Sequence, residues 1–290
     1  MKNQLLVSIA VSLLVMAMAT ATASAATCGK YTIDGDPSDW GLDLSNDWSV
    51  ESNWLPNTGV TFVVEDNRDP SYGGITGVHI RGSGSTYAPY DEPQIQHKDG
   101  FWTVEPYGGE NYDMEALYFD DESDCIYALV VTSVKEDAVG DDNRPGDLAL
   151  NLDSDFSTGE DGYEYGVKLG KNWLTQFDIY YMPDWEPSVY FPDVKPTIFK
   201  SGSSKTGSAT GAYVDTGISD NSYTNYVVEV AIPKSMVGDP GNVGMNQLHI
   251  SDQCGNDFIP APEFLFALLP VAIIGLVLGF AHTSAKRRIM

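Results

Sequence analysis

The sequence predicts an all-β protein in which a single antiparallel, jelly-roll-like β-sandwich lies between two apolar terminal segments. Short runs rich in Val, Ile, Tyr and Phe recur between clusters of Gly, Pro, Asn and Asp, which is the pattern of a sandwich. The chain also holds 16 Tyr, 11 Phe and 6 Trp, enough large side chains to build a core. We therefore expect residues 27–259 to form one exported β domain.

The first element is a predicted signal peptide over residues 1–26. Lys2 supplies a short positive start, residues 5–19 form an apolar run, and a small-residue motif, ASA, ends at Ala25. This order of parts is that of a secretory signal, which is removed on export. We expect the mature chain to begin just before Cys28.

Eight β-rich runs are expected to supply the strands of the sandwich. Some of them, such as ALVVTSV at residues 128–134, are apolar on both faces, as expected for central strands of a two-layer core. The dipeptide Asp99-Gly100 predicts a hairpin over residues 94–105. The eight expected strands are residues 60–65, 77–82, 115–120, 125–134, 147–152, 163–170, 177–182 and 225–232.

Two further segments are expected to stand apart from the sandwich. Residues 66–112 are richer in Gly, Pro and Ser, and we interpret them as a candidate insertion that decorates the domain. Residues 201–211, SGSSKTGSATG, have the composition of an exposed flexible loop.

The last element, residues 260–290, is predicted to anchor the protein in a membrane. Residues 264–281 form an uninterrupted apolar run that is long enough to cross the hydrocarbon core as a helix. Lys286, Arg287 and Arg288 follow this run. Such a basic cluster stays on the cytoplasmic side, which places the preceding domain outside the cell.

The triplet Pro262-Glu263-Phe264, the apolar span and the basic end together resemble the PEF-CTERM sorting signal of methanogenic archaea. The resemblance implies that a membrane transpeptidase, an archaeosortase, cuts near the triplet and attaches the protein to a lipid. An ordinary single-pass anchor, in which the triplet has no role, is the alternative. Both interpretations hold the protein at the cell surface through its C-terminal end.

The chain is strongly acidic, with 41 Asp and Glu against 16 Lys and Arg and a formal net charge of −25. Such a field repels phosphates and therefore argues against nucleic acid as a partner. It favours divalent cations, although a solvated, salt-adapted surface would explain the same composition without a specific ligand.

Three cysteines in an exported chain indicate one disulfide and one remaining thiol. Cys28 and Cys254 lie near the two ends of the domain, so a bond between them would close a long loop, and this is the expected pair. Cys125 lies within an expected strand, where it fits as a small buried residue. A bond from Cys125 to either of the other two, or no bond at all, remains open.

The segment IDGDPSDW, from Ile33 to Trp40, looks like the opening strand and turn of exported sandwiches of the DOMON-like, family-nine carbohydrate-binding-module type. Three later segments fit the same pattern in order: ALYFDDESDCIYALVVTSV, GDLALNLDSD with GYEYGVKLG, and YVVEVAIPKSMVG. Residues 41–112 depart from the pattern, so the family's sugar-binding function is not carried across. In purely structural terms, Asp34 and Asp39 would cap backbone amides while Trp40 packs on the core.

The loop DSDFSTGEDGYE, between two expected strands, is the best candidate for a metal site. Its oxygen-bearing side chains fall at positions 1, 3, 5, 9 and 12 of a calcium loop. Gly159 comes one residue later than a helical calcium loop requires, so the site would be a β-hairpin loop around a hard cation. A solvated acidic turn is the alternative. The candidate calcium ligands are Asp153, Asp155, Ser157, Asp161 and Glu164.

Aromatic residues that are exposed beside acids and amides can stack on sugar rings, whereas buried ones are ordinary core material. Trp173 and Trp185 are the candidates for exposed, ligand-binding aromatics. No phosphate-binding loop, dinucleotide motif or nucleophile elbow is found in the structural context that each requires.

These observations predict an exported, surface-anchored β-sandwich protein of the archaeal cell envelope, with a binding or structural role and no enzymatic activity. The alternatives are a carbohydrate-binding module and, with less support, a surface glycoside hydrolase. The expected partners are an archaeosortase-type enzyme, membrane lipid, and an envelope glycan or another surface protein. Calcium is the one expected cofactor.

Overall fold

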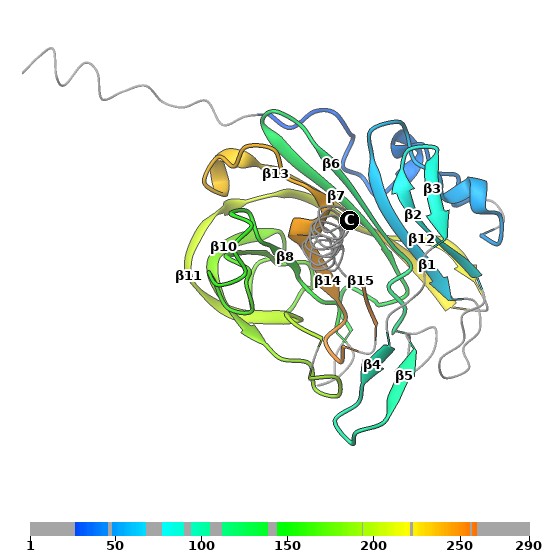
Figure 1. Cartoon of the computed structure of the whole chain (residues 1–290). Helices are drawn as coiled ribbons and strands as arrows, with labels where there is room; N and C mark the ends of the chain where they lie inside the picture. The colour runs from blue at the N-terminus through cyan, green and yellow to red at the C-terminus, as the bar shows by residue number, and fades with distance from the viewer. Residues whose placement is uncertain are drawn as a thin grey trace, which may run out of the picture.

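Figure 1 shows the computed structural model of the chain. The predicted signal peptide, residues 1–26, and the predicted anchor, residues 260–290, lie outside the residues that the structure describes. Among the residues that are described, no helix is long and apolar enough to cross a membrane. The described residues are 27–45, 48–67, 77–89, 94–104, 112–138, 144–192, 194–220, 223–255 and 257–259.

The described chain is all-β and its sheets are antiparallel, as predicted. The strands are β1 (Thr61–Asn67), β2 (Gly77–Ser83), β3 (Thr86–Pro89), β4 (Gln94–Gln96), β5 (Trp102–Val104), β6 (Ala116–Asp121), β7 (Cys125–Thr132), β8 (Leu148–Leu150), β9 (Tyr165–Val167), β10 (Asp178–Glu186), β11 (Ile198–Ser208), β12 (Thr210–Asp220), β13 (Tyr223–Pro233), β14 (Leu248–Ser251) and β15 (Phe258–Ile259). Short 3₁₀ helices lie between them: η1 (Pro37–Trp40), η2 (Glu51–Trp54), η4 (Lys234–Met236) and η5 (Met245–Gln247).

These strands form two large sheets and one small one (Figure 1). The seven-stranded sheet has the order β12-β13-β7-β6-β1-β2-β3, and the six-stranded sheet has the order β11-β10-β9-β8-β14-β15. The hairpin of β4 and β5 makes the small sheet. Gly100, with φ of 88°, lies in its turn, which confirms the predicted hairpin.

All eight predicted strands correspond to strands of the structure, namely β1, β2, β6, β7, β8, β9, β10 and β13. β8 and β9 are shorter than predicted, whereas β10 and β13 are longer. The runs rich in β-branched and aromatic residues therefore located the strands but not their ends.

The prediction of a flexible loop at residues 201–211 is wrong, because this segment lies in the long strands β11 and β12. Its glycines serve close packing instead. A Cβ on Gly207 would collide with the side chain of Met236, and a Cβ on Gly211 would collide with the ring of Phe177. Small residues at these positions let neighbouring side chains lie directly on the strands.

The candidate insertion at residues 66–112 is not a separate unit throughout. Within it, β2 pairs with β1 and β3 pairs with β2, so both strands extend the seven-stranded sheet. The β4–β5 hairpin is the part that stands apart from the two large sheets.

The two large sheets share one hydrophobic core. Val63, Leu117 and Val130 point into it from the seven-stranded sheet, and Leu148 and Ile250 point into it from the six-stranded sheet. All five are buried, as the period of two along a strand requires for residues that share a face.

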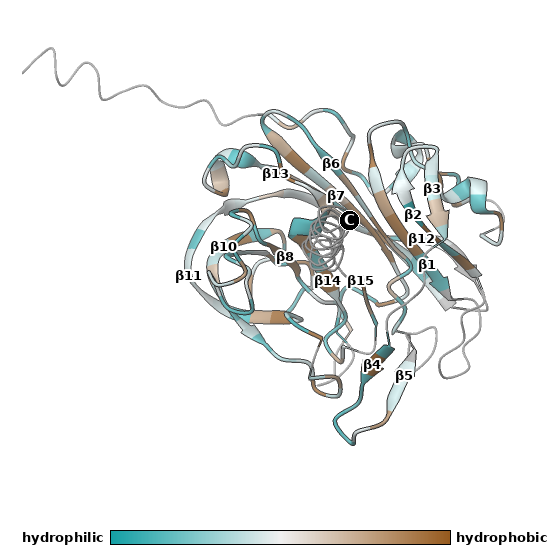
Figure 2. Cartoon of the chain, viewed as in Figure 1, coloured by the Kyte–Doolittle hydropathy of each residue, from teal (hydrophilic) through white to brown (hydrophobic). Residues whose placement is uncertain are grey.

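A second core covers the other face of the seven-stranded sheet. Phe62, Tyr118 and Tyr127 alternate with the inner-face residues and pack against Trp40 and Trp54 from the chain before β1. Figure 2 shows the resulting hydrophobic stretches along β1, β6 and β7. These strands are apolar on both faces because the N-terminal segment adds a third layer outside the two sheets.

The disulfide joins Cys28 to Cys125, with 5.7 Å between their Cα atoms, so the predicted bond between Cys28 and Cys254 is wrong. Cys125 opens β7 and faces the second core, on the side where the N-terminal segment lies. Cys254 follows β14 in the other sheet, where it is buried and its Sγ donates to Asp252. Cys28 pairs with Cys125 because the N-terminal segment packs on the outer face of the seven-stranded sheet, where the Cys125 side chain lies.

Candidate functional site

The turn at residues 34–40 is held by one buried carboxylate, Glu229 of β13. Its Oε2 accepts hydrogen bonds from the backbone N–H of Asp34 at 2.9 Å and of Gly35 at 2.6 Å. Its Oε1 accepts from Nε1 of Trp40 at 2.8 Å, and Trp40 stacks on Tyr31 with ring centroids 4.0 Å apart. Burial raises the pKa of Glu229, and the hydrogen bonds from Gly35, Trp40 and Asp34 oppose this shift.

The acids of this turn bind its own backbone, which confirms the structural interpretation of IDGDPSDW. Asp34 Oδ1 accepts from the N–H of Asp36 at 3.0 Å, and Asp39 Oδ2 accepts from the N–H of Thr32 at 2.7 Å. Asp36 caps η1 by accepting from the N–H of Ser38. The carboxylates therefore hold fixed orientations.

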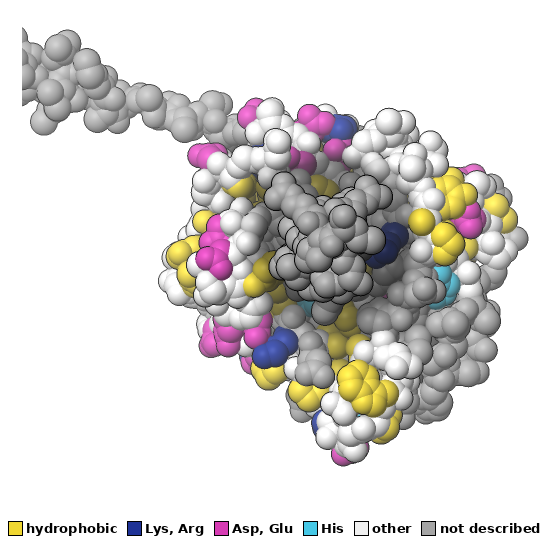
Figure 3. All heavy atoms as spheres, in the orientation of Figure 1, with side chains coloured by type: hydrophobic (Ala, Val, Ile, Leu, Met, Phe, Trp, Pro, Cys, Tyr) yellow, Lys and Arg dark blue, Asp and Glu magenta, His cyan; other side chains and the backbone are white. Residues whose placement is uncertain are grey.

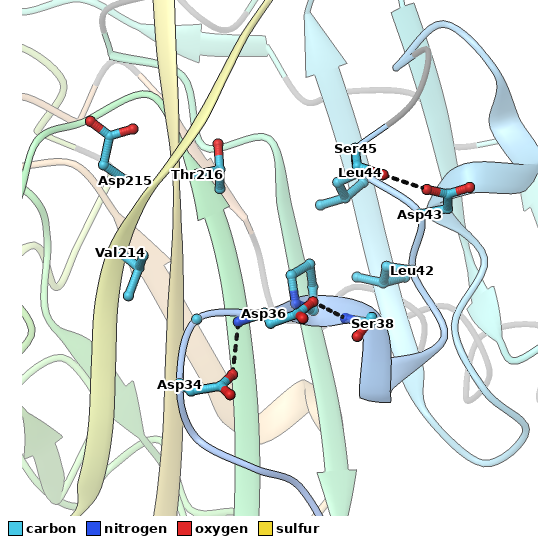
Figure 4. A pocket seen from close by; sticks show the side chains of 12 residues that line it. Asp34, Asp36, Ser38, Leu42, Asp43, Leu44, Ser45, Val214, Asp215 and Thr216 are labelled. Atoms are coloured by element: carbon cyan, nitrogen blue, oxygen red, sulfur yellow. Dashed lines mark hydrogen bonds between the residues drawn. The ribbon is translucent and has the colours of Figure 1, made fainter.

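A cavity of about 410 Å³ opens between this turn, the segment that follows it and the middle of β12 (Figure 4). Gly35, with φ of 85°, allows the turn to lie against β12, because a Cβ there would collide with Val214. The cavity is lined by Asp34, Gly35, Asp36, Pro37, Ser38, Leu42, Asp43, Leu44, Ser45, Val214, Asp215 and Thr216. We call it the acidic pocket.

Four carboxylates and several apolar side chains define the chemistry of the acidic pocket. Asp43 accepts from Ser45 Oγ at 2.9 Å and Asp215 accepts from the N–H of Gly217 at 2.8 Å, so these two are also oriented by neighbours. The described residues that line the pocket include no Lys, Arg or His. The pocket can therefore accept hydrogen bonds from a neutral or cationic ligand, whereas it repels an anion.

The carboxylates of the acidic pocket do not converge on one point. Figure 4 places Asp34 and Asp36 on the turn, Asp43 on the opposite side and Asp215 on β12. In the part of the chain that the structure describes, no group of three or more His, Cys, Asp or Glu side chains is arranged to hold a metal ion. The arrangement therefore suits a ligand with several separated donors better than a single bare ion.

The predicted calcium loop folds onto itself between β8 and β9. Thr158 Oγ1 lies 2.7 Å from Asp153 Oδ2, 2.8 Å from the carbonyl oxygen of Asp155 and 2.9 Å from Glu164 Oε1. One hydroxyl proton thus faces three acceptors. Ser157 donates to Asp155 through its backbone N–H and its hydroxyl.

Of the five predicted calcium ligands, Asp153 and Glu164 meet at the hydroxyl of Thr158, whereas Asp155 and Ser157 bond to each other and Asp161 has a different partner. Asp161 Oδ1 forms an ion pair with Lys195 at 2.9 Å instead of facing the others. Burial raises the pKa of Glu164, and a hydrogen bond shared with Glu164 lowers the pKa of Asp153, so the two carboxyls compete for one proton. Calcium binding here stays a prediction.

The two predicted ligand-binding tryptophans have opposite environments. Trp185 is only 3% exposed and packs edge-on against Phe199, so its predicted role as an exposed aromatic is wrong. It lies in β10 and is buried in a small cluster with Ala149, Tyr163 and Phe199. Trp173 is 47% exposed, as predicted, and lies outside the strands.

Two features escaped sequence reasoning. The first is Glu229, a single acid in the apolar strand YVVEVAI, and an isolated charge at a core position is a signal that a partner must exist. The second is the exposure of Phe101 and Trp102 on the predicted hairpin of β4 and β5, where Trp102 is 59% exposed. Figure 3 shows hydrophobic side chains gathered over this hairpin.

Comparison with known proteins gives no match: no protein-family model, curated protein or solved structure is similar to this chain. The chemistry of the acidic pocket and of the other sites described above is therefore what indicates a function.

Proposed function

We propose that this chain is an exported, surface-anchored protein of the archaeal cell envelope that binds, without catalysis, a ligand rich in hydrogen-bond donors. The observation that carries the proposal is the acidic pocket, a cavity with four oriented carboxylates and no base in its described lining. Its volume of about 410 Å³ falls within the usual range of small-ligand sites.

A neutral sugar is the ligand class that fits this lining best. Sugar hydroxyls can donate to separated carboxylates, while the C–H faces of the ring can contact Pro37 and Val214, which keep exposed surface. An anionic ligand would meet only repulsion from the four acids. The carbohydrate-binding alternative is thus the form of the binding role that we favour.

A glycoside hydrolase receives less support. Such an enzyme needs two carboxyl groups facing each other across the scissile bond, one of them protonated. In the acidic pocket, Asp34, Asp36 and Asp215 instead accept hydrogen bonds from the backbone of their own turns. This use is structural and keeps them in place for binding.

The surface location rests on the two terminal segments of the sequence. Residues 1–26 have the parts of a signal peptide, and residues 260–290 have the parts of a sorting signal, including Pro262-Glu263-Phe264. An archaeosortase-type enzyme and a membrane lipid are the partners that this proposal implies.

Calcium is the proposed cofactor, at Asp153, Asp155 and Glu164. The support is the crowding of three acceptor oxygens around the one hydroxyl of Thr158. A hard cation would satisfy more of these oxygens than a single proton can.

The binding proposal is tested by titrating the full chain with a panel of neutral oligosaccharides. The double variant Asp36→Asn with Asp215→Asn keeps the acceptors that hold both turns and removes two charges. We expect it to weaken binding at least tenfold. The matched control is Asp137→Asn with Asp184→Asn, two exposed acids outside the pocket, and it should bind as the wild type does. Binding equally strong in both variants contradicts the proposal, and release of reducing sugar contradicts the non-catalytic role.

A further inference from the structure

Arg144 differs from most of the described lysines in that it forms no ion pair with a described acid. Its Nη1 donates to Gln253 Oε1 at 3.5 Å, and its guanidinium lies 4.2 Å from the ring centre of Trp173. Among the described residues, no carboxylate lies within ion-pair distance of it. By contrast, eight described lysines form ion pairs with acids: Lys30, Lys135, Lys168, Lys171, Lys195, Lys200, Lys205 and Lys234.

The other two cations beside Trp173 are already neutralised. Lys168 Nζ lies 5.3 Å from the ring centre and forms a buried ion pair with Asp147 at 2.8 Å. Lys200 Nζ lies 4.7 Å from the ring centre and forms an ion pair with Glu186 at 2.7 Å. Arg144 therefore leaves this group with one net positive charge.

Two hydrogen-bond donors beside this group have no acceptor in the described chain. They are Nε of Arg144 and Nδ2 of Asn172, and both atoms are buried. Asn172 packs near Pro145, the neighbour of Arg144, because a Cβ on Gly170 would lie 3.0 Å from Pro145 Cγ and 3.2 Å from Asn172 Nδ2. Buried donors without acceptors are costly, so the group has a surplus of donors as well as of positive charge.

The backbone presents Trp173 to solvent at a conformational cost. Its φ of 57° lies in the left-handed region, which a bulky aromatic residue rarely adopts. Lys171, two residues before Trp173, is fixed twice to Glu136, through its backbone N–H at 3.1 Å and its ammonium at 2.7 Å. A strained, exposed aromatic on an anchored loop is a feature that binding sites often contain.

We propose that Arg144, Asn172 and Trp173 form a second binding site, which takes the carboxylate of a single acidic sugar such as a uronic acid. The carboxylate faces the guanidinium of Arg144, which keeps part of its surface exposed. A planar guanidinium matches the two oxygens of a carboxylate. The sugar ring contacts the exposed part of the indole of Trp173.

The overall charge limits the ligand to one anionic group. A net charge of −25 repels a polyanion as a whole, while one carboxylate at Arg144 meets a local positive charge. The anion site follows from the contacts of Arg144 alone. The choice of a sugar over a peptide rests on the surface-binding role proposed above.

The test measures binding of the full chain to an oligosaccharide of neutral sugars that ends in one glucuronic acid. The reference ligand is the same oligosaccharide with its carboxyl reduced to an alcohol. We expect the acid to bind at least tenfold more tightly than the alcohol. Arg144→Gln should abolish this preference, and Arg144→Lys, which keeps the charge but not the planar fork, should reduce it severalfold.

Lys98 supplies the matched control, because it also lies over an aromatic ring, 4.1 Å from the centre of Tyr190. Lys98→Gln should keep the preference for the acid within twofold. The variant Asp36→Asn with Asp215→Asn should keep it too, which separates this site from the acidic pocket. Equal binding of acid and alcohol to the wild type would overturn the proposal, as would a preference that survives Arg144→Gln. Competition by triglutamate as strong as by the acid would overturn the assignment to a sugar.

Discussion

The turn at residues 34–40 and the loop at residues 153–164 are both acidic, yet they use their carboxylates differently. A glutamate fastens each of them, Glu229 for the turn and Glu164 for the loop. Glu229 comes from a distant strand and binds three donors of the turn. Glu164 belongs to the loop itself and binds the N–H of Leu152 and the hydroxyl of Thr158.

The two acidic segments differ in whether a cavity remains beside them. Glu229 of β13 fixes the first turn through hydrogen bonds, so that the turn packs beside β12. The acidic pocket lies between the turn and β12. The second loop closes on its own hydroxyls and amides. The density of carboxylates in a sequence therefore does not identify a binding site, since the non-local anchor decides whether a cavity remains.

The largest effect is expected from the disulfide, which ties only the first of the two regions to the sheet. Replacing Cys28 and Cys125 by Ser opens a loop with a sequence separation of 97 residues. The loop-entropy model predicts a loss of about 4–5 kcal/mol in the free energy of unfolding, measured by urea denaturation. Cys254→Ser should cost much less, because a hydroxyl can also donate to Asp252. Peptide mapping that links Cys28 to Cys254 would contradict the structure.

The two glutamates can be compared directly. Glu229→Gln places an amide donor against backbone and indole donors in a buried site, so we expect a loss of about 3–4 kcal/mol in unfolding free energy. Glu164→Gln should cost clearly less, because Glu164 accepts from only two donors and one of them, the hydroxyl of Thr158, has other acceptors within reach. Equal losses in urea denaturation would mean that the two anchors are equivalent.

His249, which packs beside Tyr163 of the loop at residues 153–164, makes the unfolding free energy depend on pH. Its ring is buried beside Tyr163, and burial lowers its pKa from 6.5 to about 4, against the opposing effects of the Pro196 carbonyl and Asp161. The stability that the neutral ring contributes is complete above pH 6.5 and is lost as the pH falls towards 4. This amounts to about 3 kcal/mol.

His249→Phe should remove this contribution, so its unfolding free energy should fall less steeply than that of the wild type between pH 6.5 and 4. If the unfolding free energies of the two proteins fall equally with pH, the ring takes up its proton in the folded state as easily as in the unfolded one.

The smallest effect is expected from calcium, whose binding would make the loop at residues 153–164 a metal site. At a hundredfold excess over its Kd, one bound ion would stabilise the fold by about 2.7 kcal/mol. The melting temperature should rise with calcium and respond much less to sodium at equal ionic strength. Asp153→Asn with Asp155→Asn should abolish the response. A response that persists in this variant would place the ion elsewhere, and no response in the wild type would leave the loop as a self-bonded turn.

Local patterns in the sequence were enough to locate the all-β class, the eight strands, the hairpin at Asp99-Gly100 and the turn of IDGDPSDW. Each of these depends on residues that are close together in the chain: a run of β-branched and aromatic residues, a turn dipeptide, or an acid that caps a nearby amide. The same reasoning missed β11 and β12, because their glycines and serines resemble a loop until Met236 and Phe177 are placed above them.

Contacts between distant segments were decided only by the tertiary structure. The partner of Cys28, the role of Glu229 and the meeting of Arg144 with Trp173 all depend on which faces and edges of the sheets come together. Alternation tells which residues of a strand share a face, but not which segment will cover that face. The acidic pocket exists because the chain before β1 packs on the outer face of the seven-stranded sheet, and no local pattern specifies that contact.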